Sequence, residues 1–400
     1  MSVADKLLPH LSRRTTSGQF IPEIDGLRFA SIALVVLFHL SGYTVGKSSP
    51  LHRPTLADNP LARVAATGHY GVQLFFIISG FVLALPFARH YLDATAAPRL
   101  RAYYLRRLTR LEPPYIAAML LVFVVATEFF GAPERLLWPH LLASLTYLHN
   151  LVYGVPSTVN VVAWSLEVEV QFYLIAPLLA CVYVIRRKTY RRIVVLVGIA
   201  GAILIQRYGI AVDSRLSLTL LNYLQYFLLG FLLADFYLSE WRVPSVNERA
   251  WDGVGVLSWI IMVVVWLKIP RPLVLFPLLA LIIFCATFRG RWLRAAFRNR
   301  WIATIGGMCY TIYLLHYPII SAIGRYTIRI GANDGFVLHV LVQAAIILPL
   351  LLFVSTLFFV TIERPCMQKD WPQRLAALRS ASWARTRQMV PSVVRSLWRA

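Results

Sequence analysis

Apolar blocks, most of them long enough for four or more helical turns, follow one another along almost the whole chain and are separated by short polar or basic stretches. A helix needs about 20 mostly apolar residues to cross a bilayer. The pattern therefore predicts an all-α fold, a polytopic bundle of about ten transmembrane helices. The fifth, seventh and eighth blocks are near the short limit, and we expect these helices to be tilted or partly re-entrant. The ten blocks are Phe29–Val45, Tyr70–Ala88, Pro114–Phe130, Ala163–Ile185, Ile193–Gln206, Ser217–Leu238, Val254–Leu267, Pro272–Phe288, Ile302–Ile323 and Phe336–Ile362.

One further stretch, Leu136–Tyr153, is rich in aromatic and apolar residues but is not continuous enough to span. It is interrupted by Pro139, His140, His149 and Asn150. Polar groups of this kind are costly in hydrocarbon. We predict an interfacial or re-entrant helix on the external side.

The distribution of Lys and Arg predicts the orientation. With the N-terminus inside, about three-quarters of the 40 basic residues fall in cytoplasmic segments, as the positive-inside rule requires. We therefore predict a multi-pass protein of a bacterial-type inner membrane with both termini in the cytoplasm. Residues 1–27 form a basic leader, residues 28–363 a membrane domain, and residues 364–400 a basic tail that is either amphipathic on the inner leaflet or disordered.

Composition excludes an ordinary soluble domain. The chain is 58% hydrophobic and 14% charged, whereas soluble domains are about 45–50% apolar and about 25% charged. Its net charge of +22 is accompanied by no nucleic-acid-binding signature, so anionic membrane lipids are the predicted partner and nucleic acid is not. The four cysteines show no CxxC or Cys/His spacing, and neither a disulfide framework nor a metal site is predicted.

Ionisable residues inside the apolar blocks are the most informative, because each costs about 3 kcal/mol to place in hydrocarbon. His39 follows Arg28 by eleven residues, so the two share a helix face with His39 about 16 Å deeper. This spacing places His39 near the bilayer centre and Arg28 at the cytoplasmic edge. A neutral imidazole there suits a general base. The alternative is a histidine that only bonds a neighbouring backbone carbonyl.

The fourth block opens with a second group of polar side chains. Ser165, Glu169 and Tyr173 are four residues apart and therefore share one face, with Trp164 beside them. A buried carboxylate needs a partner or water, which makes Glu169 a candidate functional residue. Glu167 faces another direction and is interpreted as structural.

Two more pairs have the spacing of a functional site. Tyr313 and His316, with aromatic neighbours in the ninth block, form a plausible pocket wall, although a helix cap or interfacial anchor would look alike. Arg107 and Arg110 are neighbours on a helix, and paired guanidinium groups suit the phosphates of a nucleotide carrier. A cytoplasmic positive-inside cluster is the alternative interpretation for the arginines.

Six motifs occur in a fixed order along the chain, and together they resemble the acyltransferase-3 family of membrane O-acyltransferases, which includes bacterial surface-polysaccharide and macrolide acylating enzymes. The resemblance covers roughly residues 20–365. The motifs are Arg28 with His39, Phe75-Phe76-Ile77-Ile78-Ser79-Gly80-Phe81, Arg107-x-x-Arg110, Trp164-Ser165-Leu166-x-x-Glu169-x-x-Phe172-Tyr173, Tyr313-Leu314-Leu315-His316 and Glu363-Arg364-Pro365.

The resemblance implies that a cytoplasmic acyl-CoA donates an acyl group, often acetyl, to a hydroxyl of a carbohydrate-type acceptor such as a cell-surface or lipid-linked glycan. On this basis His39 is the predicted general base, acting on the acceptor hydroxyl or in forming a transient acyl-enzyme, and Glu169 orients it or positions the acceptor. Arg28, Arg107 and Arg110 are predicted to hold the donor, and no metal is required. The predicted substrate pocket comprises Trp164, Ser165, Tyr173, Tyr313 and His316.

Two further expectations follow. Some members of the family carry an extracytoplasmic esterase-like domain after the last helix; this chain continues for only about 35 residues, so no such domain is expected. A transporter or flippase for a lipid-linked glycan would also bury histidines and acids within a helical bundle. No inverted repeat is visible in the sequence, and the arginine–histidine arrangement favours a bound nucleotide donor over transport.

Overall fold

The computed structural model describes residues 8–13, 20–47, 59–209, 214–241, 243, 245–269, 272–332, 335–368 and 371. These residues are largely helical and none of them forms a strand, which confirms the predicted all-α fold. Of the predicted tail, residues 364–400, only 364–368 and 371 are described, and the rest lies outside the described residues. The main helices are α2 (Pro22–Lys47), α4 (Pro60–Ala66), α5 (Gly71–Asp93), α6 (Leu100–Val124), α7 (Glu134–Leu145), α8 (His149–Tyr153), α9 (Trp164–Leu179), α10 (Lys188–Leu204), α11 (Leu224–Ser239), α12 (Glu248–Lys268), α13 (Leu275–Arg289), α14 (Trp292–Phe297), α15 (Arg300–Gly307), α16 (Cys309–Thr327), α17 (Phe336–Phe358) and α18 (Arg364–Cys366).

Seven helical stretches in the described part of the chain are long and apolar enough to cross a membrane. Ten were predicted. The other three predicted segments correspond to α11 and α13, which are 16 and 15 residues long, and to α16, whose tyrosines and histidine lower its hydropathy. The cytoplasmic placement of both ends stays a prediction. The seven stretches are Pro22–Lys47, Pro60–Asp93, Leu100–Phe129, Val161–Val184, Lys188–Gly209, Glu248–Lys268 and Phe336–Cys366.

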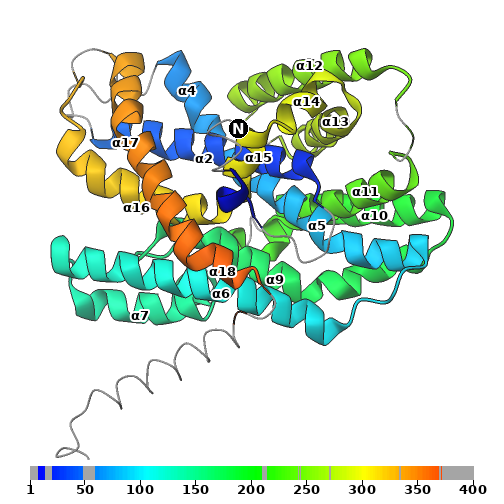
Figure 1. Cartoon of the computed structure of the whole chain (residues 1–400), viewed down its shortest axis with the longest axis horizontal. Helices are drawn as coiled ribbons and strands as arrows, with labels where there is room; N and C mark the ends of the chain where they lie inside the picture. Colours follow the sequence, from blue (N-terminus) through cyan, green and yellow to red (C-terminus); the bar gives the residue numbers. More distant parts are fainter. Residues whose placement is uncertain are drawn as a thin grey trace, which may run out of the picture.

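Helix α2 lies at the centre of the bundle, between α16 and α17 on one side and α14 and α15 on the other (Figure 1). Glycines allow the closest helix crossings. A Cβ on Gly306 would collide with the Asp25 carbonyl of α2, and one on Gly80 of α5 would collide with the Phe227 carbonyl of α11. These crossings bring backbone against backbone, which fixes α2 and α5 relative to their neighbours.

Two predicted boundaries were wrong. The ninth segment was predicted as one helix, but it is broken at Met308 into α15 and α16, two residues after Gly306, which packs closely against α2. Helix α6 begins at Leu100 rather than Pro114, because its charged first half lowers hydropathy without opposing helix formation. Arg107 and Arg110 consequently lie on the same helix as the apolar segment.

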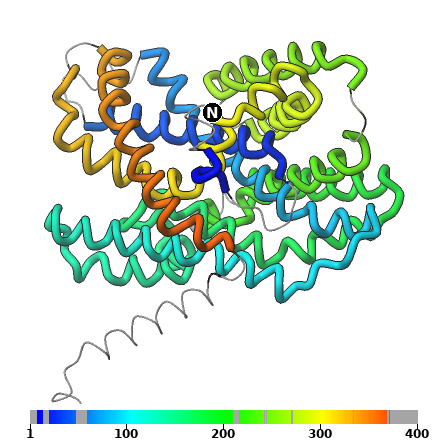
Figure 2. Tube along the Cα trace, in the orientation of Figure 1, coloured from blue at the N-terminus to red at the C-terminus, as the bar shows by residue number. Residues whose placement is uncertain are grey.

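The two ends of the described chain meet. The guanidinium of Arg364 donates to the backbone carbonyl oxygens of Pro9 and Ser12, at 3.0 and 3.4 Å. In the Cα trace the dark blue segment 8–13 accordingly lies beside the orange-red end of the last helices (Figure 2). Residues 8–13 thus pack against the start of α18.

The stretch predicted as a helix that does not span forms α7 and α8, and neither is among the spanning helices. Helix α7 packs antiparallel against α6. Phe123 stacks on Trp138 with ring centroids 5.2 Å apart, and the Tyr115 hydroxyl donates to the Ser144 carbonyl at 3.0 Å. Tyr115 and Phe123 are both on α6, so this pairing aligns the two helices along much of their length.

A histidine pair closes the α7–α8 hairpin. His149 Nδ1 lies 3.1 Å from the Val155 carbonyl, so it carries the proton, and His149 Nε2 lies 2.8 Å from Nδ1 of His140 and accepts from it. Burial, and then the neighbouring His140, lowers the pKa of His149 below its ordinary value of 6.5. The folded hairpin therefore contains a neutral His149.

We expect the stability of the protein to fall as the pH drops below about 6.5. Because the folded pKa of His149 is lowered, the unfolded chain binds this proton more readily, and acid favours unfolding. The thermal unfolding midpoint in detergent, compared between pH 7.5 and pH 5, measures the effect. His149→Gln should reduce the pH dependence; an unchanged dependence in this variant would contradict the assignment.

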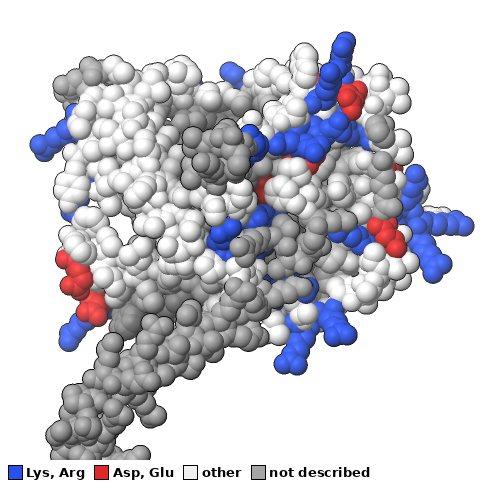
Figure 3. Space-filling model, viewed as in Figure 1, with Lys and Arg blue, Asp and Glu red and all other residues white. Residues whose placement is uncertain are grey.

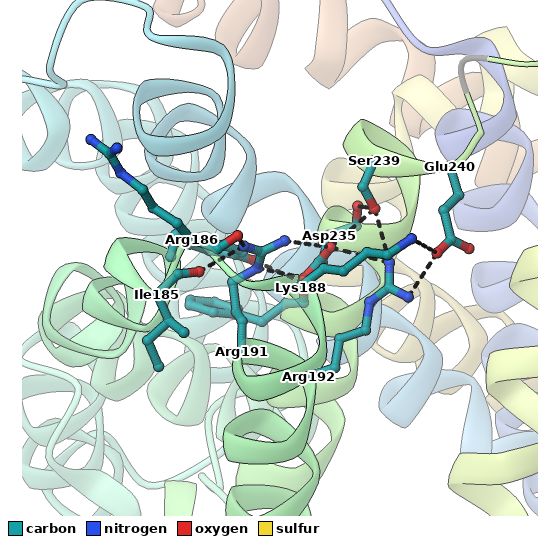
Figure 4. Close-up of polar contacts among 10 residues, drawn as sticks. Ile185, Arg186, Lys188, Arg191, Arg192, Asp235, Ser239 and Glu240 are labelled. Carbon is teal, nitrogen blue, oxygen red and sulfur yellow. Dashed lines mark hydrogen bonds and ion pairs between the residues drawn. The ribbon is translucent and has the colours of Figure 1, made fainter.

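Charge is distributed unevenly over the surface. Lys and Arg gather around the centre and toward the side where α10, α11 and α14 lie, while the face over α16 and α17 is almost uncharged (Figure 3). One cationic cluster is buried: Arg191 of α10 forms a two-pronged ion pair with Asp235 of α11, at 2.6 and 3.0 Å (Figure 4). Arg192 extends the cluster to Asp235 and to Glu240. Asp235 thus joins two helices.

Candidate active site

A cavity of about 390 Å³ lies between α2, α5, α6, α9 and α16. One part of its wall is cationic, formed by Arg28, Arg106, Arg107 and Arg110. Elsewhere the wall carries hydroxyl and carboxyl groups on an otherwise apolar and aromatic surface. These polar residues are Ser79, Ser165, Glu169, Tyr173, Tyr310, Tyr313 and Glu363.

Arg28 is held by a carboxylate that sequence reasoning did not assign. Its Nη1 donates to Asp25 at 2.6 Å, and Nε of Arg13 donates to the other carboxylate oxygen at 2.7 Å. Asp25 is fully buried. Burial, and the adjacent Arg28, lowers the pKa of Arg13 to about 10. The signal in the sequence was an acid three residues before the arginine, a spacing that places both on one helix face.

Arg107 and Arg110 face the cavity, and part of the hydrogen-bonding capacity of each guanidinium group is unused. Arg107 lies over the Tyr103 ring, 3.9 Å from its centroid, and one Nη donates to the Tyr103 carbonyl at 3.3 Å. Within the described part of the chain, Nε of Arg107 and Nε of Arg110 are buried and have no hydrogen-bond partner. Such donors are costly to bury unpaired, and they fit an anionic group entering the cavity.

Glu169 is bonded to α5. Its carboxylate accepts a hydrogen bond from the Ser79 hydroxyl. Ser79 belongs to the second-block motif, but no role was predicted for it. Ser165 on the same helix is 2.6 Å from the Tyr313 hydroxyl, which itself donates to the Val162 carbonyl at 3.1 Å. The serine–tyrosine pair therefore ties α9 to α16 in the cavity wall.

His39 and His316 lie together beyond Tyr313. The ring centroids of His316 and Tyr313 are 5.6 Å apart, and those of the two histidines 4.9 Å. His316 Nε2 and His39 Nδ1 are separated by 3.0 Å. Neither histidine lines the arginine cavity; Tyr313 stands between the cavity and the pair.

The hydrogen bonds assign the tautomers of this pair. His316 Nδ1 is 2.7 Å from the Tyr313 carbonyl and His39 Nδ1 is 3.1 Å from the Val35 carbonyl. A carbonyl only accepts, so both Nδ1 atoms carry protons in the neutral rings. His39 then donates to Nε2 of His316, and Nε2 of His39 retains its lone pair. This is the protonation state that a general base requires.

The structure brings some predicted site residues together and separates others. Within the described residues no hydrogen bond joins His39 to Glu169; the hydrogen-bond partner of His39 on another helix is His316. Trp164 packs on Phe76 and Tyr223, and is absent from the cavity wall. Predicted residues that line the cavity are Arg28, Arg107, Arg110, Ser165, Glu169, Tyr173 and Tyr313.

Other residues of interest escaped sequence reasoning. Cys309 lines the cavity as a free thiol, and Glu363 does so while accepting a hydrogen bond from Thr311 at 2.5 Å. Glu363 stood in the closing motif without a predicted role. Glu167 accepts a hydrogen bond from the backbone N–H of Asn150 at 2.8 Å, which agrees with its structural interpretation.

Comparison with known proteins decides the family. A family model described as "Acyltransferase domain", that of the acyltransferase-3 family, matches residues 21–363. The chain belongs to the acyltransferase-3 family. This acyltransferase domain contains every residue that lines the cavity, from Arg28 to Glu363.

Curated relatives of the acyltransferase-3 chain are named as O-acetyltransferases. It is 26% identical over 341 residues to "Putative O-acetyltransferase SACOL0978" of Staphylococcus aureus (strain COL), covering 77% of this chain and 52% of the relative. It is 27% identical over 346 residues to "Peptidoglycan O-acetyltransferase OatA" of Listeria monocytogenes, covering 77% and 51%. The chain thus spans about half the length of the curated relatives it matches. No solved structure matches it.

Proposed function

We propose that this membrane acyltransferase moves an acyl group, acetyl in the simplest case, from a cytoplasmic acyl-CoA to a hydroxyl of a carbohydrate-type acceptor at a bacterial inner membrane. The observation that carries the proposal is the cavity itself. It joins four arginines to the Ser165–Tyr313 pair, with a histidine bearing a free Nε2 just beyond. The name of the Listeria relative, a peptidoglycan O-acetyltransferase, supports a glycan acceptor.

In this mechanism the arginines bind the donor phosphates and the thioester lies toward Ser165 and Tyr313. His39 Nε2 takes the proton of the acceptor hydroxyl as its oxygen attacks the thioester carbonyl. The carbon–sulfur bond breaks, and CoA leaves with a proton. Ser165 and Tyr313 line the wall beside the oxygen that becomes negative, and a hydroxyl that turns away from its present acceptor would donate to that oxygen. His316 acts through His39, since its Nε2 accepts a hydrogen bond from His39 Nδ1–H and thereby orients the ring.

The test of the function is release of CoA from radiolabelled acetyl-CoA by the purified protein, with the label recovered on an added glycan such as a peptidoglycan fragment. Release that depends on the glycan supports the proposal. Failure to release CoA, together with protein-dependent movement of a lipid-linked glycan across a vesicle membrane, would favour the transporter instead.

We expect Arg107→Gln and Arg110→Gln each to weaken CoA binding about tenfold or more. Hydrogen bonds to charged groups contribute about 1.5–3 kcal/mol, and both guanidinium groups face the cavity. Equilibrium binding of labelled CoA to protein in detergent measures the loss. Arg99→Gln is the control, because Arg99 is exposed at the start of the same helix and does not line the cavity. Equal affinity in all three variants would contradict the phosphate role.

A further inference from the structure

A second cleft, of about 530 Å³, lies between α6 and α9. It meets the arginine cavity along a shared wall formed by Arg107, Leu111, Leu166, Glu169, Tyr173 and Tyr310. The two spaces are therefore neighbours that share Glu169, and an extended ligand lying in one of them can reach the other.

The far side of the cleft faces lipid. Its wall there is formed by Leu105, Leu108 and Leu174, whose exposed fractions are 46%, 57% and 63%. Leu174 belongs to a stretch that is apolar and long enough to span a membrane, whereas Leu105 and Leu108 lie beside Arg106 and Arg107 in the charged first half of α6. We infer that this open edge meets lipid near the boundary of the bilayer, and that the cleft leads from the shared wall to that edge.

Hydrogen bonds between α6 and α9 keep the cleft in shape. The Tyr103 hydroxyl donates to the Tyr173 carbonyl at 3.2 Å, and the Tyr104 hydroxyl donates to the Leu174 carbonyl at 3.0 Å. These two hydrogen bonds fix the separation of α6 and α9 at Tyr103 and Tyr104. The cleft is the space that remains between the two helices.

We propose that this cleft takes the alkyl chain of the donor, so that the enzyme binds acyl-CoA with chains longer than acetyl. The inference rests on the proposed function. A thioester at Ser165 would have its carbonyl one helical turn from Glu169 of the shared wall, and a longer chain would then run past Glu169 between Leu108 and Leu174. Outside the shared wall the cleft is lined by four apolar residues, Leu105, Leu108, Val170 and Leu174, and by the polar Arg101, Tyr104, Glu112 and Tyr147. The apolar four supply the surface along which an alkyl chain would lie.

The length of the acyl chain should affect the affinity of the enzyme for acyl-CoA. Each methylene that leaves water for an apolar site contributes about 0.8 kcal/mol, up to about fourfold in affinity. Because the far wall of the cleft is open to lipid, only part of a chain is buried, and we expect octanoyl-CoA to bind about tenfold or more tightly than acetyl-CoA.

The experiment measures displacement of labelled CoA by acetyl-CoA and octanoyl-CoA in nanodiscs. Leu174→Trp fills the cleft and should abolish the preference for octanoyl-CoA, leaving acetyl-CoA affinity unchanged. Leu178→Trp is the matched control. Leu178 is one turn further along α9, is 73% exposed and does not line the cleft, so the preference should persist.

Four results would overturn the inference, and they are distinguishable. Equal affinity for both donors in the unmodified protein, or a preference that survives Leu174→Trp, shows that the chain does not use the cleft. A tightly bound membrane lipid, detected by mass spectrometry and lost in Leu174→Trp, without a chain-length preference, assigns the cleft to that lipid. In these three cases acetyl-CoA still binds and the proposed function stands. In the fourth case no CoA ester binds, and both proposals are removed.

Discussion

Replacing His39 by alanine is expected to lower the rate of acyl transfer by about 10²- to 10⁴-fold, the contribution typical of a general base, while CoA binding stays unchanged. The position of His39 explains why the rate of transfer should change while CoA binding does not. His39 does not line the arginine cavity, and its Nε2 carries the lone pair that the hydrogen bonds to Val35 and His316 leave available. Transfer from labelled acetyl-CoA and equilibrium CoA binding, measured on the same preparation, check both parts.

His69→Ala is the matched control for this prediction. His69 contacts Phe38, the neighbour of His39, but it is exposed and its ring nitrogen bonds the nearby backbone carbonyl of Ala66. Its loss should leave transfer close to that of the unmodified protein. His316→Gln should cause a smaller decrease in rate than His39→Ala, because His316 orients the base without contacting the acceptor. Wild-type transfer by His39→Ala would remove the base assignment.

Replacing Asp235 by alanine is expected to lower the free energy of unfolding by about 3–5 kcal/mol. The Arg191 side chain is 2% exposed and has its only carboxylate partner, among the described residues, in Asp235. Removing that partner leaves a buried positive charge uncompensated between α10 and α11. Unfolding in mixed detergent micelles, followed by helix content, measures the change.

Glu240→Ala provides the comparison. Glu240 accepts from Arg192 at 2.7 Å, but its side chain is 40% exposed, and exposed ion pairs contribute at most about 1 kcal/mol. A double variant, Arg191→Met with Asp235→Leu, should recover most of the lost stability, because both charges are removed together. Equal destabilisation by Asp235→Ala and Glu240→Ala would contradict the argument.

Local sequence pattern was sufficient for most of the fold. Continuous apolar blocks predicted the positions of α2, α5 and α17, because in a bilayer the backbone must satisfy its own hydrogen bonds and a helix is the local way to do so. The pattern failed where tertiary contacts intervene. The break at Met308 comes two residues after the close contact of Gly306 with α2, and hydropathy alone contains no information about either feature.

The candidate site likewise has features that the local sequence predicted and features that tertiary contacts decided. Helical spacing correctly placed Arg107 beside Arg110, and Ser165 on one face with Glu169 and Tyr173, because those neighbours are three or four residues apart. It could not pair Asp25 with Arg13, Ser79 with Glu169, or His39 with His316. The last pair is 277 residues apart in the chain, and only the packing of α16 on α2 brings the rings together.

By itself, the sequence determined that this protein is a helical membrane protein with buried acid–base groups and a basic side, since burial cost and helical periodicity are local properties of the chain. The tertiary structure alone decided which of those groups meet. It paired the two histidines and so left one imidazole nitrogen free, it gathered the arginines around one cavity, and it opened a lipid-facing cleft against that cavity at Glu169. These outcomes depend on distances between helices, which are set by side-chain volume and close glycine crossings across the whole bundle.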